Sequence, residues 1–96
     1  MNLIEKIGMP ALLELCAEEC NELAHACLKF SRKIRNENPT PKSEEECIEE
    51  LIEEMADVQL CMGLLVHNTD DISVESIESW LMFKENRMKE RLMKEV

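Results

Sequence analysis

The chain has few positive charges, no long apolar run and no linker-like segment. Its 96 residues include 11 Lys and Arg against 21 Asp and Glu, which gives a net charge of -10 at pH 7. Proteins that bind a nucleic-acid backbone need a basic surface, so this balance argues against nucleic acid as a partner. No segment approaches the roughly 18 consecutive apolar residues of a membrane span, and we therefore expect no membrane partner.

Glycine and proline are also scarce, with 2 and 3 residues. No stretch rich in Gly, Pro or Ser divides the chain, so the length predicts one domain over residues 1–96. The N-terminus lacks the basic stretch followed by an apolar run that marks a secretory signal. We therefore expect a cytoplasmic protein.

Five cysteines are present, without the spacing of a zinc finger or a C-x-x-C motif. Cys16, Cys20 and Cys27 recur at helical spacing with Leu13 and Leu23, on one apolar seam. Reduced cysteines that act as small hydrophobic side chains explain this pattern better than a metal or redox role.

Apolar residues recur at helical spacing, and strand-like alternation is absent. Pro10 suits the first position of a helix that extends to about Arg35. A proline-containing loop, 36–42, then interrupts the pattern. Ser43 opens the next helix with the capping-box sequence Ser-Glu-Glu-Glu, and Ser73 is the predicted N-cap of the last helix. The predicted long helices span 10–35, 44–66 and 74–95.

These segments predict an all-α fold, a small bundle of three main helices plus a short N-terminal helix at Met1–Met9. A chain of this length buries little apolar surface alone, and three helices leave an apolar face open. The stretch Leu60–Val66 is apolar nearly all round, which is typical of a helix buried between neighbours or between subunits. We expect homo-oligomerisation to complete a four-helix-type core.

Two pairs of carboxylates mark the candidate site, Glu19-x-x-Glu22 on the first long helix and Glu54-x-x-Asp57 on the second. Side chains three residues apart share one face of a helix, with Cβ atoms roughly 5–6 Å apart. Each pair lies on a helical line beside the main apolar seam. These lines are Leu12, Leu15, Glu19, Glu22 and Ala26, and Glu50, Glu54, Asp57, Cys61 and Leu64.

A solvated run of charge is not expected on such partly apolar lines. If the two helices face each other, the four carboxylates meet and raise one another's pKa unless a cation lies among them. Carboxylate oxygens are ligands of Mg²⁺ or Mn²⁺, whereas zinc favours His or Cys. We therefore predict a Mg²⁺ site, with Mn²⁺ as the other candidate, formed by Glu19, Glu22, Glu54 and Asp57.

Mg²⁺ in proteins is commonly completed by substrate phosphates, so the carboxylate pairs predict a phosphate-bearing substrate. Two such ions polarise a phosphoryl group and lower the pKa of an attacking water. On the last helix, Lys84 interrupts an apolar line, and Asn86, Arg87 and Arg91 lie near it. Two interpretations stay open: these residues hold phosphates, or Lys84 extends its charge to solvent and the cations complement the helix dipole.

The sequences EECNEL at Glu18–Leu23 and EEMADV at Glu53–Val58, followed by a closing helix with Lys84 and Asn86, resemble the MazG-like family of all-α nucleoside triphosphate pyrophosphohydrolases. The resemblance covers roughly Leu12–Arg91. It implies a bundle completed as a homodimer or homotetramer. The implied reaction is Mg²⁺-dependent cleavage of the α–β phosphate bond of a nucleoside triphosphate, giving a monophosphate and pyrophosphate.

Carried over by position, the resemblance makes Glu19, Glu22, Glu54 and Asp57 the metal ligands. Either Glu19 or Glu22 orients the water, and Asn86 is similar to the family's nucleotide-contacting asparagine. The chain departs from the family in two places. It has Met82 where members often have a lysine, so Lys84 or Arg87 substitutes or phosphate binding is weaker. Few aromatic residues are present to form a base pocket, which leaves the preferred base open.

Two other functions remain in view. His25 follows Glu22 by three residues, and Glu-x-x-His is the step used in di-iron bundles. A second such step is absent within the chain, because Leu60 follows Asp57 at that spacing, although a homodimer would supply it by symmetry. The other alternative is a non-catalytic helical interaction protein, whose charge runs and Met-rich seams are surface and core.

Overall fold

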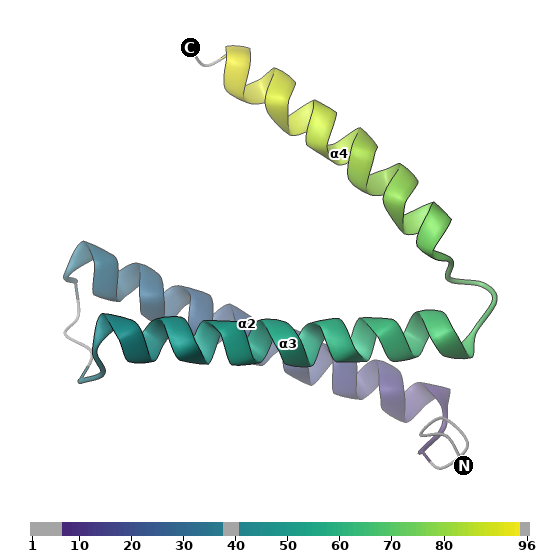
Figure 1. Ribbon diagram of the computed structural model, residues 1–96, viewed down its shortest axis with the longest axis horizontal. Helices are drawn as coiled ribbons and strands as arrows, with labels where there is room; N and C mark the ends of the chain where they lie inside the picture. Colours follow the sequence, from purple (N-terminus) through teal and green to yellow (C-terminus); the bar gives the residue numbers. More distant parts are fainter. Residues whose placement is uncertain (1–6, 38–40, 95–96) are drawn as a thin grey trace. The chain divides into compact units, whose positions relative to one another are not determined.

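The computed structural model describes residues 7–37 and 41–94, which form three helices and no strand (Figure 1). The all-α prediction is confirmed. The short helix predicted at Met1–Met9 lies largely outside the described residues. The helices are α2, Met9–Arg35, α3, Glu44–Asn68, and α4, Val74–Lys94.

The ends of α2 follow from local sequence. Pro10 lies in the first turn, where its missing N–H costs no helical hydrogen bond. At the other end Asn36 adopts the left-handed conformation, with φ of 57°. The backbone N–H groups of Asn36 and Glu37 donate to the carbonyls of Lys33 and Arg32 at 3.2 and 3.1 Å. These bonds close the last turn of the helix.

Side-chain caps begin both α3 and α4, as predicted. The Ser43 hydroxyl accepts from the Glu46 N–H at 3.1 Å, and the Glu46 carboxylate accepts from the Ser43 N–H at 3.1 Å. This reciprocal pair is the capping box. The Ser73 hydroxyl accepts from the Ser76 N–H at 3.1 Å. Helix α3 ends at Asn68, two residues later than predicted.

The chain forms two compact units, Met1–Leu65 and Val66–Val96. In the first unit, α2 and α3 lie side by side and run in opposite directions (Figure 1). The most buried side chains of this pair are small or aliphatic, and each has at most 6% of its surface exposed. They are Leu12, Ala26, Cys47 and Cys61.

The helical lines that carry the carboxylates face each other across the α2–α3 contact. Ala26 on α2 and Cys61 on α3 belong to these lines and are buried. The adjacent apolar seams are open in the single chain, since Leu13 is 50% exposed and Met62 is 48% exposed. The apolar stretch at Leu60–Val66 is likewise open on one side. These seams are the surface that the predicted self-association would cover.

Helix α4 makes up most of the second unit and has no buried residue. Its apolar side chains include Trp80 and Phe83, whose rings meet edge to face at a centroid distance of 5.8 Å. An amphipathic helix of this length is marginally stable without packing.

None of the helices in residues 7–37 and 41–94 combines the length and the apolar composition that a membrane span requires.

Candidate metal centre

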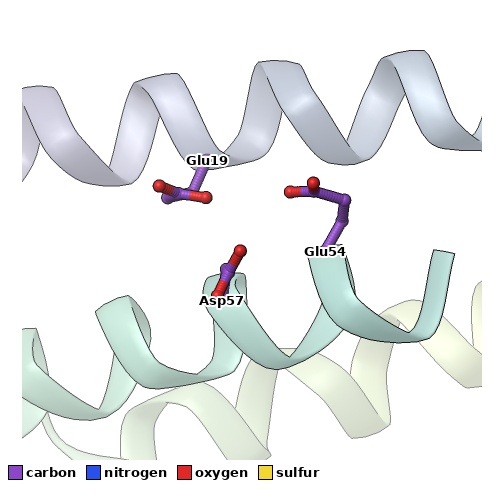
Figure 2. A group of neighbouring side chains, drawn as sticks. All are labelled: Glu19, Glu54 and Asp57. Atoms are coloured by element: carbon purple, nitrogen blue, oxygen red, sulfur yellow. The ribbon is translucent and has the colours of Figure 1, made fainter. Parts of the chain in front are cut away.

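Three carboxylates meet between α2 and α3. Figure 2 shows Glu19 of α2 directed toward Glu54 and Asp57 of α3. Each residue offers one carboxylate oxygen, and these oxygens lie within 4.8 Å of one another. All three side chains are half-buried. The cluster therefore combines close spacing with partial exclusion of water.

The antiparallel arrangement of α2 and α3 produces this meeting. Residue numbers rise along one helix while they fall along the other, so Glu19 lies near Asp57. A salt bridge of 3.5 Å between Lys29 and Glu50 continues the same pairing two to three turns away. Because both carboxylate pairs repeat at three residues, one face of each helix contributes to the same place.

Burial and like charge both disfavour ionisation in the cluster. Burial raises the pKa of Glu19, and the charges of Asp57 and Glu22 and a hydrogen bond with Asp57 raise it further. Burial likewise raises the pKa of Glu54, followed by the charges of Asp57 and Glu22. A cation bound between the carboxylates would remove most of this penalty.

One oxygen of Glu54 is suited to be a ligand of such a cation. Its Oε2 atom is shielded from solvent and has no hydrogen-bond partner among the described residues. An unsatisfied buried polar atom costs about 1–3 kcal/mol, which a metal–oxygen contact would offset. The donor set consists of carboxylate oxygens alone, as hard ions such as Mg²⁺ and Mn²⁺ prefer.

A pair of thiols lies next to the carboxylates without joining them. Cys61 is 4% exposed. Burial raises the pKa of Cys61 to about 11, and a hydrogen bond with Cys16 and the nearby charges of Glu19 and Asp57 act in the same direction. A neutral thiol is a poor metal ligand. These two cysteines thus leave the centre all-oxygen, whereas Cys20 and Cys27 of the predicted apolar seam are exposed.

The structure brings together three of the four predicted metal ligands. Glu22 is exposed and lies outside the group of three, although its charge acts on Glu19 and Glu54. His25, the residue of the di-iron alternative, is also exposed and outside the group. The predicted substrate-binding residues all lie on α4, in the second unit, with exposed side chains. They are Lys84, Asn86, Arg87 and Arg91.

A cavity of about 320 Å³ adjoins the carboxylates in the first unit. Its walls come from both helices and include Glu54, so it opens beside the candidate metal centre. The volume is at the small end of the range for ligand sites. The lining residues are Glu22, His25, Ala26, Leu28, Lys29, Arg32, Glu50 and Glu54.

The cationic part of this lining was missed by sequence reasoning. Lys29 and Arg32 follow Glu22 on α2 at spacings of seven and ten residues, which return to nearly the same helical face. Glu50 of α3 pairs with Lys29 and also accepts a hydrogen bond from Lys42. The hydrogen bond from Lys42 lowers the pKa of Glu50, and burial opposes this effect. The helical spacing of Lys29 and Arg32 from Glu22 was the sequence feature that could have placed these cations near the carboxylates.

Comparison of the chain with protein-family models, with curated proteins and with solved structures gives no match.

Proposed function

We propose that the protein is a Mg²⁺-dependent nucleoside triphosphate pyrophosphohydrolase, with Mn²⁺ as a possible substitute ion. The observation that supports this most is the group of three carboxylates, whose oxygens lie within 4.8 Å across two facing helices. The unpartnered Oε2 of Glu54 adds to it. The MazG-like resemblance of the two motifs points to the same chemistry.

In this proposal Glu19, Glu54 and Asp57 hold the metal. When bound, the metal would polarise the α-phosphate and lower the pKa of the attacking water. The water oxygen bonds to the α-phosphorus, and the bond from that phosphorus to the α–β bridging oxygen breaks. The bridging oxygen keeps the electron pair and leaves on pyrophosphate.

Glu22 is the better candidate to orient the water and accept its proton. It lies beside the group of three and is exposed, so its carboxylate is free to face substrate. Glu19 is the second candidate, but in this proposal its carboxylate already holds the metal with Glu54 and Asp57. A general base must reach the water that it activates, which favours the less engaged carboxylate.

The MazG-like resemblance also proposes substrate-binding residues on the last helix. Lys84, Asn86, Arg87 and Arg91 are exposed on α4 and in this proposal contact a nucleotide from the cytoplasmic pool. An acidic chain needs such groups, together with metal ions, to hold a polyanion. A homodimer or homotetramer would cover the open apolar seams of α2 and α3.

The direct test is a screen of canonical and modified nucleoside triphosphates with Mg²⁺ or Mn²⁺, read as pyrophosphate release. We expect release that depends on the metal. Glu54→Gln and Asp57→Asn should each reduce the rate on the order of 100-fold, because each removes a charged group from the reaction centre. Glu53→Gln, an exposed neighbour on α3, is the matched control and should retain activity.

A helical interaction protein is the second candidate, favoured by the absence of any buried residue on α4. It makes the opposite prediction for the carboxylates. No nucleotide would be turned over at micromolar protein, and Glu54→Gln with Asp57→Asn would leave function intact. That result would end the hydrolase proposal.

A further inference from the structure

The cavity beside the carboxylates also has cationic side chains in its wall, at the end formed by Lys29, Arg32 and Glu50. Within residues 7–37 and 41–94, the ion pairs are those of Glu50 with Lys29 and with Lys42. One carboxylate thus serves two ammonium groups. Arg32 also lines the cavity and has no ion pair among the described residues. At that end, the cavity wall carries two positive charges, those of Lys29 and Arg32, against the one carboxylate of Glu50, which Lys42 also contacts from outside the cavity.

We propose that Lys29 and Arg32 form a phosphate-binding subsite that holds the terminal phosphates of the substrate and then the leaving pyrophosphate. This inference rests on the proposed function, because that function supplies the polyphosphate. It also places phosphate-binding cations within the same helix pair as the carboxylates.

The spacing along α2 suits a triphosphate. Lys29 is seven residues from Glu22, which is roughly 10 Å along the helix axis at 1.5 Å per residue. Both residues line the same cavity. The lysine and arginine side chains are long enough to meet a polyphosphate whose α-phosphate lies at the carboxylate end.

The chemistry of the two cations also fits a phosphate. The planar guanidinium of Arg32 can donate two parallel hydrogen bonds to phosphate oxygens, and a lysine ammonium adds a compact charge. Negative charge increases on the leaving pyrophosphate as the α–β bond breaks. Cations already positioned at that end would stabilise this charge more strongly in the transition state than in the bound substrate.

The subsite is tested by calorimetric titration of the full-length protein with inorganic pyrophosphate in the presence of Mg²⁺. We expect wild-type protein to bind, and Arg32→Ala and Lys29→Met each to weaken binding about tenfold, the loss of one charged hydrogen-bond partner. Lys29→Met keeps the aliphatic stem of the side chain. Arg32→Lys should recover part of the affinity.

Arg35→Ala is the matched control. It removes the same charge from the last turn of α2, but Arg35 is exposed and is not part of the cavity wall. Its affinity for pyrophosphate should change less than twofold. Thermal unfolding of each variant confirms that the helix pair is intact.

Three results would overturn the subsite. They are no pyrophosphate binding by the wild type, equal weakening by Arg35→Ala and Arg32→Ala, and unchanged pyrophosphate affinity in Arg32→Ala with a base-dependent loss of nucleotide affinity. The last would mean that the cavity holds the nucleobase. Pyrophosphate binding that depends on Arg32, without turnover of any nucleotide, would support the subsite while rejecting the proposed hydrolase.

Discussion

Glu19 and Glu54 are ionisable groups placed where their charge is disfavoured. Burial is the largest cause of the raised pKa of each, and neighbouring carboxylates add to it. In a protein that evolved only for stability, apolar residues on these lines would pack α2 against α3 without this repulsion. Their presence at the helix contact is the residue-level argument for a bound cation.

A pH dependence follows for the metal-free protein. The ordinary pKa of these carboxyls is 4.5, and the folded state raises it. Between pH 4.5 and the raised values, the folded chain binds more protons than the unfolded chain, so the free energy of unfolding falls as pH rises. With a chelator present, the Tm of the wild type should be higher at pH 5 than at pH 7.

The double variant Glu19→Gln with Glu54→Gln should show a smaller difference between the Tm at pH 5 and the Tm at pH 7, since glutamine does not titrate. The exposed neighbours Glu18→Gln and Glu53→Gln provide the control pair with the same change in net charge. The lowered pKa of Glu46, caused by its hydrogen bonds with Ser43, places its titration below this range. An equal pH response in the two double variants would contradict the prediction.

At the scale of elements, α3 illustrates how local interactions define a helix. Its capping box satisfies two backbone N–H groups, and its first turn carries Glu44, Glu45 and Glu46, which complement the positive end of the helix dipole. Helix α4 also has a serine cap, but none of its side chains is buried. A cap can start a helix, whereas packing supplies most of its stability.

Removal of the α3 cap should weaken the helix pair. Ser43→Ala deletes the hydroxyl that accepts from the Glu46 N–H, and we expect the free energy of unfolding to decrease by about 1 kcal/mol. Urea unfolding followed by circular dichroism measures this change. Ser43→Asp retains an acceptor and should lose much less. Equal losses in the two variants would show that the cap contributes little.

At the scale of the whole molecule, the exposed apolar seams indicate an incomplete core. Leu13 and Met62 are about half exposed in the single chain. Small chains bury a smaller fraction of their surface than larger ones, and oligomerisation is one way to compensate. A dimer or tetramer formed through these seams would leave the carboxylates inside each α2–α3 pair.

Light scattering after size exclusion tests this assembly. The wild type should have twice or four times the mass of the 11.2 kDa chain. Met62→Glu places a charge on the seam, where burial in an interface would be costly, and should shift the mass toward one chain. Gln59→Glu, an exposed position on the same helix, should have no effect. A wild type with the mass of one chain would refute self-association.

Short-range sequence was sufficient for the helices. Pro10, Ser43 and Ser73 marked helix starts within one residue, because caps and proline act on their nearest turns. The three-residue spacing of Glu54 and Asp57 was likewise enough to place them on one face. Each of these features depends on residues fewer than five positions apart.

Which faces of α2 and α3 meet could be decided only from the tertiary structure. Sequence periodicity placed the carboxylates on lines beside the apolar seams, but it did not show that these lines meet. In the folded chain the pair meets along them, at small side chains such as Ala26 and Cys61, which allow the helices to approach. In this pairing of α2 and α3, Glu22 lies outside the group of three, and Arg32 is part of the wall of the cavity near Glu54. Helical periodicity describes one helix at a time, whereas the pairing of faces depends on how two surfaces fit.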